Sequence, residues 1–140
     1  MIHINDDILN VREGIIAHQV NCKRVAGAGL ALQIRSKYPD WYTSYRNRAP
    51  QLGICSLFKV SDTLMIASLY GKYGYGRGTM HTDYRALEDA LLNLYIWRDM
   101  VSMIISFPFG MGCGLAGGDW DIVSDLIEKY FPNDNIYKLG

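Results

Sequence analysis

Short apolar segments alternate with segments of helical periodicity along the chain, and this alternation is the feature that most constrains its fold. Apolar and β-branched runs predict strands at 1–5, 14–21, 53–60, 63–70, 102–108 and 135–139. Helices are predicted over 25–39 and 40–48, from Thr82–Asp83 onward, and after the glycines that end at 118. A chain with this alternation builds a layered α/β fold around a largely parallel sheet.

The composition suits one domain spanning residues 1–140, because 49% of the 140 residues are hydrophobic. The net charge of zero argues against broad binding of duplex DNA, which needs a concentrated basic surface. No apolar run approaches the roughly 18–20 residues of a membrane span. Two acids in the first ten residues argue against a signal peptide.

The cysteines and histidines are spaced like neither a disulfide framework nor a zinc site. They are Cys22, Cys55, Cys113, His3, His18 and His81. An odd, sparse set of cysteines without CxxC spacing favours a reducing compartment. We therefore expect a cytoplasmic monomer with no metal, no cofactor and no membrane partner.

Two glycine-rich loops each lead from a predicted strand into a predicted helix. The first is 26-AGAGL-30, and the second is 110-GMGCGLAGG-118, with five glycines in nine positions. Ligands of parallel sheets bind beyond the carboxyl ends of the strands, where helix N-termini offer unpaired N–H groups to anions. Two such loops predict a diphosphate cradle, although tight turns alone would also explain the glycines. Neither loop contains GxxxxGK[ST] or the full GxGxxG fingerprint.

Four stretches, in this order along the chain, resemble the macro domain, a family of ADP-ribose-binding modules. They are 7-DI-8, 15-IIAHQVNC-22, 26-AGAGLALQI-34 and 112-GCGLAGGDW-120, with Asp6 in place of the usual glycine before the first. The resemblance implies a three-layer α/β/α fold with a mixed, mostly parallel sheet. It also implies that the two glycine loops hold the diphosphate and the distal ribose.

The resemblance implies roles for individual residues. Asp7 would accept from the adenine amino group beside the Ile8 backbone, with a capping Asp as the alternative. Asn21 would face the distal ribose, or else bond only to local backbone. The other implied ligand contacts are Cys22, Gly27, Ala28, Gly29, Leu30, Tyr70, Gly112, Cys113, Gly114, Leu115, Ala116 and Gly117. Cys113 is read as a small loop residue, because no base stands beside it in the sequence.

The segment 70–84 carries three tyrosines, of which Tyr73 and Tyr75 fall in a predicted glycine-rich loop over 71–82. Together with Tyr70 they would cover the distal ribose or a base, or else pack on their own loop. Arg77 of this loop is a candidate contact to one nucleotide. His81 reads as a residue at a helix start.

The expected chemistry rests on His18 and Lys72. The sequences 18-HQVNC-22 and 29-GLALQ-33 resemble a branch with yeast-type and phage ADP-ribose 1''-phosphate phosphatases and hydrolases that remove ADP-ribose from glutamate or DNA. A histidine near pKa 6.5 transfers protons at neutral pH, although a packed strand histidine is an equal alternative. Lys72 falls where the glutamate- and DNA-directed hydrolases carry a catalytic lysine, although loop lysines are often only solvated. Ala116 replaces an aspartate of the glutamate-directed enzymes.

We expect an enzyme that binds ADP-ribose and its 1''-substituted forms, and that hydrolyses ADP-ribose 1''-phosphate to ADP-ribose and phosphate. In this hypothesis Asn21 orients the distal ribose and His18 handles the proton. A second hypothesis is removal of ADP-ribose from protein or DNA through Lys72. A third is a reader that binds ADP-ribose without turnover.

Overall fold

A six-stranded sheet runs through the middle of the protein, whose computed structural model describes residues 1–75 and 81–139. The elements follow in the order β1 (Ile2–Ile4), η1 (Ile8–Asn10), β2 (Gly14–Asn21), α1 (Gly29–Lys37), α2 (Pro39–Asn47), β3 (Cys55–Lys59), β4 (Leu64–Lys72), α3 (Tyr84–Arg98), β5 (Ile105–Pro108), α4 (Trp120–Tyr130) and β6 (Asn135–Tyr137). Every strand and helix predicted from the sequence is present. The short 3₁₀ helix η1 was not predicted.

The strand order of the sheet is β1-β6-β5-β2-β4-β3. All neighbouring strands are parallel except β3, which pairs antiparallel with β4 across the turn at Ser61–Asp62. The prediction of a mixed, mostly parallel sheet is therefore confirmed. The order places β2 between β5 and β4, so the carboxyl ends of these three parallel strands lie next to one another.

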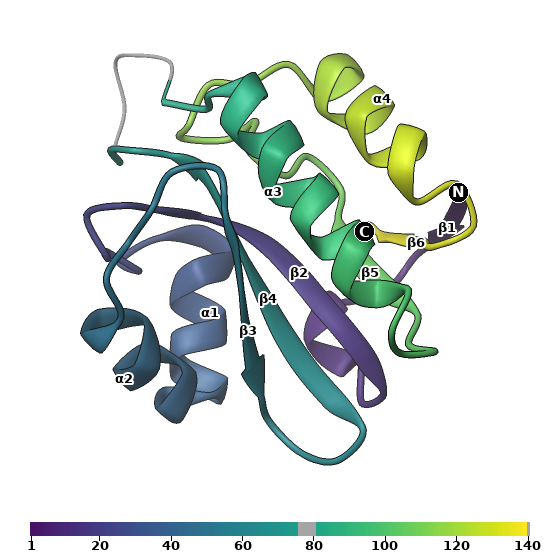
Figure 1. Cartoon of the computed structure of the whole chain (residues 1–140), viewed down its shortest axis with the longest axis horizontal. Helices are drawn as coiled ribbons and strands as arrows, with labels where there is room; N and C mark the ends of the chain where they lie inside the picture. Colours follow the sequence, from purple (N-terminus) through teal and green to yellow (C-terminus); the bar gives the residue numbers. More distant parts are fainter. Residues whose placement is uncertain (76–80, 140) are drawn as a thin grey trace.

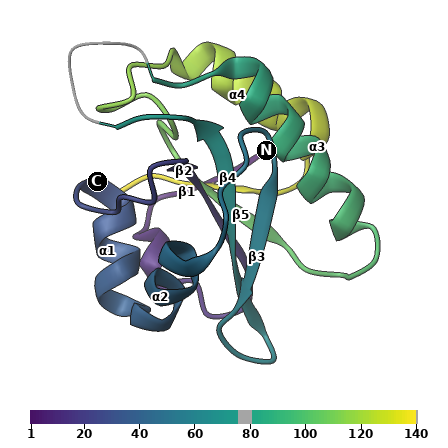
Figure 2. The ribbon, with the colours of Figure 1, turned by 60° about the vertical axis from the view of Figure 1, so that its left-hand side comes forward.

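Helices cover both faces of the sheet, with α1 and α2 on one side and α3 and α4 on the other (Figures 1 and 2). Alternate side chains of β2 point to opposite faces, as the pleat of a strand requires. Ile15 and Ala17 belong to the core beneath α3 and α4, whereas Ile16 and Val20 belong to the core beneath α1 and α2. The strand is buried on both faces, which explains its continuous apolar sequence.

The helix starts follow from capping side chains that the sequence supplies. The Asp83 carboxylate accepts a hydrogen bond from the Ala86 N–H at the start of α3, and Asp119 accepts from the Asp121 N–H at the start of α4. Pro39 occupies the first turn of α2, where its missing N–H has no intrahelical partner to lose.

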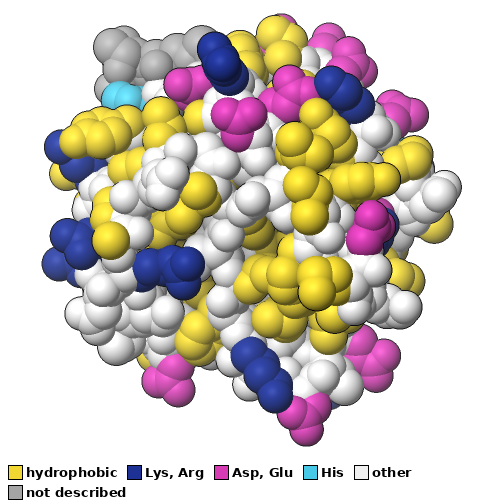
Figure 3. Space-filling model, viewed as in Figure 1, with side chains coloured by type: hydrophobic (Ala, Val, Ile, Leu, Met, Phe, Trp, Pro, Cys, Tyr) yellow, Lys and Arg dark blue, Asp and Glu magenta, His cyan; other side chains and the backbone are white. Residues whose placement is uncertain are grey.

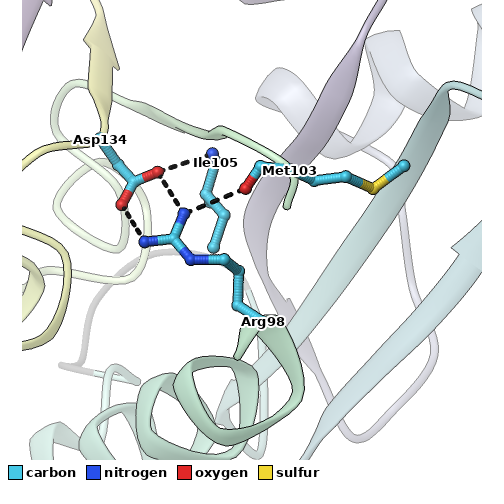
Figure 4. Close-up of polar contacts among 4 residues, drawn as sticks. All are labelled: Arg98, Met103, Ile105 and Asp134. Carbon is cyan, nitrogen blue, oxygen red and sulfur yellow. Dashed lines mark hydrogen bonds and ion pairs between the residues drawn. The ribbon is translucent and has the colours of Figure 1, made fainter. Parts of the chain in front are cut away.

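A buried ion pair ties the end of α3 to the amino ends of β5 and β6 (Figure 4). Arg98 binds both carboxylate oxygens of Asp134 at 2.7 and 2.8 Å, and also donates to the Met103 carbonyl. Asp134 is 2% exposed and additionally accepts from the Ile105 N–H. This network lies at the opposite end of the parallel strands from the glycine loops.

Two boundaries differ from the sequence prediction, and both affect the site. Helix α1 begins at Gly29 rather than near residue 25, so residues 25–28 form the loop that precedes it. Strand β4 continues to Lys72, so Lys72 is a strand residue and not a loop residue. Among the described residues, no helix has the length and apolar character needed to cross a membrane.

Candidate functional site

A cavity of about 440 Å³ lies at the carboxyl ends of β2, β4 and β5. Its wall combines four groups of residues: the end of β2, the loop before α1 with the first turn of that helix, the end of β4 with Tyr75, and the end of β5 with the loop that follows it. Its lining residues are His18, Gln19, Val20, Asn21, Val25, Gly27, Ala28, Gly29, Leu30, Ala31, Lys72, Tyr75, Pro108, Phe109, Gly110, Met111, Gly112, Gly114, Leu115 and Ala116. Both predicted glycine loops therefore meet at one site, at the sheet edge where a parallel sheet binds its ligands.

The first loop ends at the N-terminus of α1. Ala28 caps this helix with extended backbone and makes no side-chain capping bond, and Gly29 starts it at φ +57°. The first-turn N–H groups of a helix have no intrahelical acceptors and carry partial positive charge. Gly27, Ala28 and Gly29 thus present backbone with little side chain toward the cavity.

The second loop, residues 110–118, is folded back on itself by its own backbone. Gly118 N–H donates to the Gly112 carbonyl at 2.9 Å, and Cys113 N–H donates to the Gly110 carbonyl at 2.9 Å. A Cβ on Gly118 would lie 2.6 Å from the Gly112 oxygen, so no larger residue fits there. Gly112 has φ +77°, a conformation that side chains disfavour. The glycines are therefore required by the shape of the loop.

A buried side-chain relay fixes the second loop to the rest of the site. Gln19 Nε2 donates to Thr82 Oγ1 at 3.0 Å, and Thr82 Oγ1 donates to the Gly112 carbonyl at 2.7 Å. The backbone N–H groups of His81 and Thr82 both donate to the Ala116 carbonyl. Sequence reasoning missed this relay, because Gln19 and Thr82 are 63 residues apart and belong to no local motif.

Asn21 lines the cavity, but its side chain also holds the turn that follows β2. Its Nδ2 donates to the Val25 carbonyl at 2.8 Å, and its Oδ1 accepts from the Val25 N–H at 3.1 Å. A shift of register between Val20 and Asn21 pairs Asn21 with Lys72, and such a bulge changes the direction in which the following side chain points. One amide proton and one oxygen lone pair of Asn21 remain for a ligand.

His18 lies at the floor of the cavity and is only 2% exposed. Its ring packs on Trp41, with centroids 5.0 Å apart, and neither ring nitrogen has a hydrogen-bond partner among the residues that the structure describes. Burial, and secondarily the positive charge of Lys72, lowers the pKa of His18 to about 3. His18 is therefore neutral at physiological pH and holds no imidazolium proton to donate.

Lys72 ends β4 at the cavity wall and is, within the described part of the chain, the only Lys or Arg that lines it. No ion pair to Lys72 occurs among the described residues. Burial lowers the pKa of its amine. Lys72 and His18 line the same cavity, so the structure brings the two predicted catalytic side chains to one site.

Six predicted contacts are not part of the cavity wall, and four of them, Asp7, Ile8, Cys22 and Tyr70, lie outside the second glycine loop. Tyr70 is fully buried beneath α1 and α2, because the pleat of β4 directs it away from the cavity and toward Tyr45. Cys22 is buried in the same core. Asp7 caps η1, with its Oδ1 accepting from the Leu9 N–H at 2.9 Å, and Ile8 is 5% exposed in that core. Asp7 thus caps η1, and its contact to an adenine amino group stays a prediction.

Other predicted residues lie within the second loop or beside it. Cys113 donates its thiol to the Met111 carbonyl, and burial, followed by the charge of Asp119, raises its pKa to about 11. Its thiol is therefore protonated at neutral pH, in keeping with a small loop residue. Gly117 has φ +77° and shapes the loop without lining the cavity. Ala116 is 4% exposed and does line it.

The two tyrosines that follow β4 lie in different surroundings. Tyr75 lines the cavity, whereas the exposed Tyr73 ring lies beneath the Lys23 ammonium at 4.7 Å. Arg77 lies outside the described residues. No group of three His, Cys, Asp or Glu side chains suited to a metal ion occurs within residues 1–75 and 81–139.

Comparisons with known proteins give two kinds of relative. No protein-family model matches the sequence. An uncharacterized 17.5 kDa protein from the tk-vs intergenic region of Enterobacteria phage T4 is 25% identical over 122 residues, which are 82% of this chain and 78% of the phage protein.

Several of the similar solved structures are macrodomains. A macrodomain protein from Streptomyces coelicolor superposes with a TM-score of 0.81 at 22% identity, covering 99% of each chain. The DarTG protein of Thermosipho africanus, solved in complex with ADP-ribose, superposes with a TM-score of 0.80 at 18% identity over 99% of this chain and 41% of that one. The sheet, its helical layers and these superpositions together show that this chain has the macrodomain fold.

Proposed function

We propose that the cavity binds ADP-ribose and that the protein hydrolyses ADP-ribose 1''-phosphate to ADP-ribose and phosphate. One observation carries the binding proposal: two glycine-rich loops, at the ends of neighbouring parallel strands, line a single cavity. Each loop offers bare backbone to a ligand, and the first also offers the positive end of α1. The ADP-ribose complex of a protein with the same fold supports the choice of ligand.

A diphosphate bound in this way needs few cationic side chains. Backbone N–H groups aimed at phosphate oxygens are fixed before the ligand arrives, so binding does not require their reorganisation. The adenosine end of the ligand would extend along the apolar part of the wall, where Phe109 and Leu115 are partly exposed. Asn21 and Lys72 lie at the ends of β2 and β4, and we assign the distal ribose to that side.

In the proposed hydrolysis, a water oxygen bonds to phosphorus while the bond from phosphorus to the 1''-oxygen breaks. The water loses a proton and the 1''-oxygen gains one. We assign the proton of the attacking water to the one acceptor nitrogen of the neutral His18 ring. Its lowered pKa makes His18 a weak base, so this step requires the ring to become accessible to water in the bound complex. Backbone N–H groups of the two loops would stabilise the charge that develops on the phosphate oxygens.

Lys72 supports a second candidate, removal of ADP-ribose from a protein or nucleic acid adduct. The lowered pKa of this amine increases the fraction that is unprotonated and therefore nucleophilic toward C1'' of an opened ribose. A reader without turnover remains the third hypothesis.

Replacing His18 and Lys72 separately by Ala tests these assignments. For the phosphatase, His18→Ala lowers phosphate release from ADP-ribose 1''-phosphate about 10²-fold or more, while ADP-ribose still binds. For the second candidate, Lys72→Ala abolishes adduct removal. Lys59→Ala is the matched control, because Lys59 pairs with Asp62 on the surface. Wild-type protein that binds ADP-ribose but turns over neither substrate is a reader, and both enzyme proposals then fail.

A further inference from the structure

The turn between β2 and the first glycine loop contains a strained arginine. Arg24 has φ 60°, and it is the only non-glycine residue with positive φ in the described part of the chain. A bulky side chain rarely adopts this left-handed conformation. Strain of this kind persists only where the surrounding contacts enforce it, and it is concentrated at functional sites.

The contacts that enforce the turn are unusually dense. Asn21 closes it with two side-chain bonds to Val25, and the Arg24 N–H donates to the Asn21 carbonyl at 3.4 Å. The buried Tyr45 hydroxyl donates to the Asn21 carbonyl at 2.8 Å and accepts from the Asn21 N–H at 3.3 Å. The turn is therefore a rigid support that fixes where the Arg24 side chain begins.

Arg24 and Arg46 are joined by two reciprocal hydrogen bonds, each from the guanidinium of one residue to the backbone carbonyl of the other. Arg24 Nη1 donates to the Arg46 carbonyl at 2.9 Å, and Arg46 Nη1 donates to the Arg24 carbonyl at 3.2 Å. Lys23 directly precedes Arg24 in the chain, and its ammonium group lies over the Tyr73 ring. None of these three cations forms an ion pair with a described residue, so the positive charges gather without a protein counterion.

The wider charge distribution places these cations on one side of a neutral molecule. Residues 21–48 contain six Lys or Arg but only one acidic residue, Asp40, whereas residues 81–134 contain three Lys or Arg and nine Asp or Glu. In Figure 3, several Lys and Arg side chains gather on the left-hand side, and most Asp and Glu side chains lie along the upper and right-hand edge. The zero net charge therefore conceals a basic face.

The arginine turn adjoins the cavity on the side of Lys72. Asn21 and Val25, at either end of the turn, line the cavity, and the Cys22 N–H donates to the carbonyls of Lys72 and Tyr73. We propose that Arg24, Arg46 and Lys23 form an anion site at this rim, which binds a phosphate group of the substrate beyond the diphosphate held by the glycine loops. Guanidinium groups suit this task because they bind phosphate oxygens through paired N–H donors.

The inference deepens the proposed function, because it assigns a charged group to the substituent on the distal ribose. Two sources would supply that group. One is the phosphate of ADP-ribose 1''-phosphate, and the other is the phosphodiester backbone of a nucleic acid strand that carries ADP-ribose. An uncharged or amide-linked substituent would gain nothing from these cations.

Arg24→Gly separates anion binding from a purely structural role. Glycine adopts φ 60° without strain, so this variant removes the guanidinium and relieves the turn at the same time. We expect unchanged or higher stability in urea and a Kd for ADP-ribose within about twofold of wild type. Arg24→Ala removes the guanidinium but keeps the strain, and Arg12→Ala is a control for loss of one surface arginine.

The two phosphate sources are distinguished by two assays on the same variants. If the site holds the terminal phosphate, Arg24→Gly raises the KM for ADP-ribose 1''-phosphate about tenfold or more. If the site holds a nucleic acid backbone, Arg24→Gly instead weakens binding of a fluorescent single-stranded oligonucleotide and reduces the salt dependence of that binding. The oligonucleotide assay needs no ADP-ribose, so its result stands even if the proposed function fails.

The inference is overturned if Arg24→Gly matches wild type both in its KM for ADP-ribose 1''-phosphate and in oligonucleotide binding. It is equally overturned if the wild-type protein neither hydrolyses ADP-ribose 1''-phosphate nor binds the oligonucleotide. It is also overturned if Arg24→Gly only lowers stability, because the guanidinium would then serve to tether α2 to the turn.

Discussion

At the scale of single residues, burial determines the protonation state of the two predicted catalytic side chains and their access to a ligand. His18 stands in a sequence context that suggests a proton donor, yet its ring is enclosed between β2 and α2 and its pKa is lowered to about 3. Lys72, at the end of the next strand, keeps contact with the cavity while burial lowers the pKa of its amine. Of the two, Lys72 has the easier access to a ligand.

The lowered pKa of His18 predicts a specific loss of stability in acid. The unfolded chain binds a proton at His18 near pH 6.5 and the folded chain only near pH 3, so acid favours the unfolded state between these values. Between pH 7 and 4.5 this effect is about 2 to 3 kcal/mol of unfolding free energy. His18→Leu should lose that much less stability than wild type over the same range, as measured by urea denaturation. His3→Gln is the control, since His3 is exposed. An equal acid loss in wild type and His18→Leu would contradict the prediction.

At the scale of elements, the second glycine loop depends on side chains that are distant in sequence. Thr82→Val is nearly isosteric but removes the hydroxyl that accepts from Gln19 and donates to the Gly112 carbonyl. We expect faster hydrogen exchange at the Gly118 amide and an affinity for ADP-ribose lower by about tenfold, equivalent to about 1.4 kcal/mol. Thr82→Ser should restore both properties, whereas Thr43→Val, on the exposed surface of α2, should change neither. Unaltered exchange in Thr82→Val would show that the relay does not hold the loop.

The two loops also predict different responses to one added methyl group. Within the described part of the chain, the methyl group of Gly27→Ala meets no atom closer than the Val25 side chain at 3.8 Å, whereas that of Gly118→Ala would collide with the Gly112 carbonyl. Gly27→Ala should therefore fold normally and lose affinity for ADP-ribose, because its methyl group occupies the approach to the backbone. Gly118→Ala should lose both stability and affinity. Calorimetric titration together with thermal unfolding checks both, and normal affinity in Gly27→Ala would contradict the cradle.

Sequence patterns predicted the elements well where burial and turn chemistry agree. Strand β2 was predicted at both ends, because Gly14 and Asn21 bound a run that is buried on both faces. The position of Tyr70 was missed for a physical reason. Alternation along β4 shows that Tyr70 and Leu69 point to opposite faces of the sheet. It does not show which of the two faces is covered by α1 and α2. The Gln19–Thr82 relay and the Arg24 turn depend on tertiary contacts, so no local pattern could have revealed them.

At the scale of the whole molecule, stability and ligand binding depend on opposite ends of the sheet. The Arg98–Asp134 network joins α3 to β5 and β6 at the amino ends of the strands, away from the cavity. Arg98→Ala leaves the buried Asp134 carboxylate without its cation, and it should lower the unfolding free energy by about 3 kcal/mol. The affinity of the remaining folded protein for ADP-ribose should not change.

The exposed ion pair between Lys129 and Glu88 provides the control for that prediction. Lys129→Ala should leave the unfolding free energy nearly unchanged, because solvent screens the pair. Urea denaturation of both variants checks the difference. Equal effects of the two substitutions would show that burial of Asp134 does not determine the strength of its ion pair.

The most direct test of the account is calorimetric titration of the wild-type protein with ADP-ribose, with AMP as the comparison ligand. A cradle made by two glycine loops predicts saturable one-to-one binding of ADP-ribose in the micromolar range, and much weaker binding of AMP, which lacks the diphosphate and the distal ribose. Absence of ADP-ribose binding, or equal affinity for the two ligands, would contradict the claim that the loops bind a diphosphate.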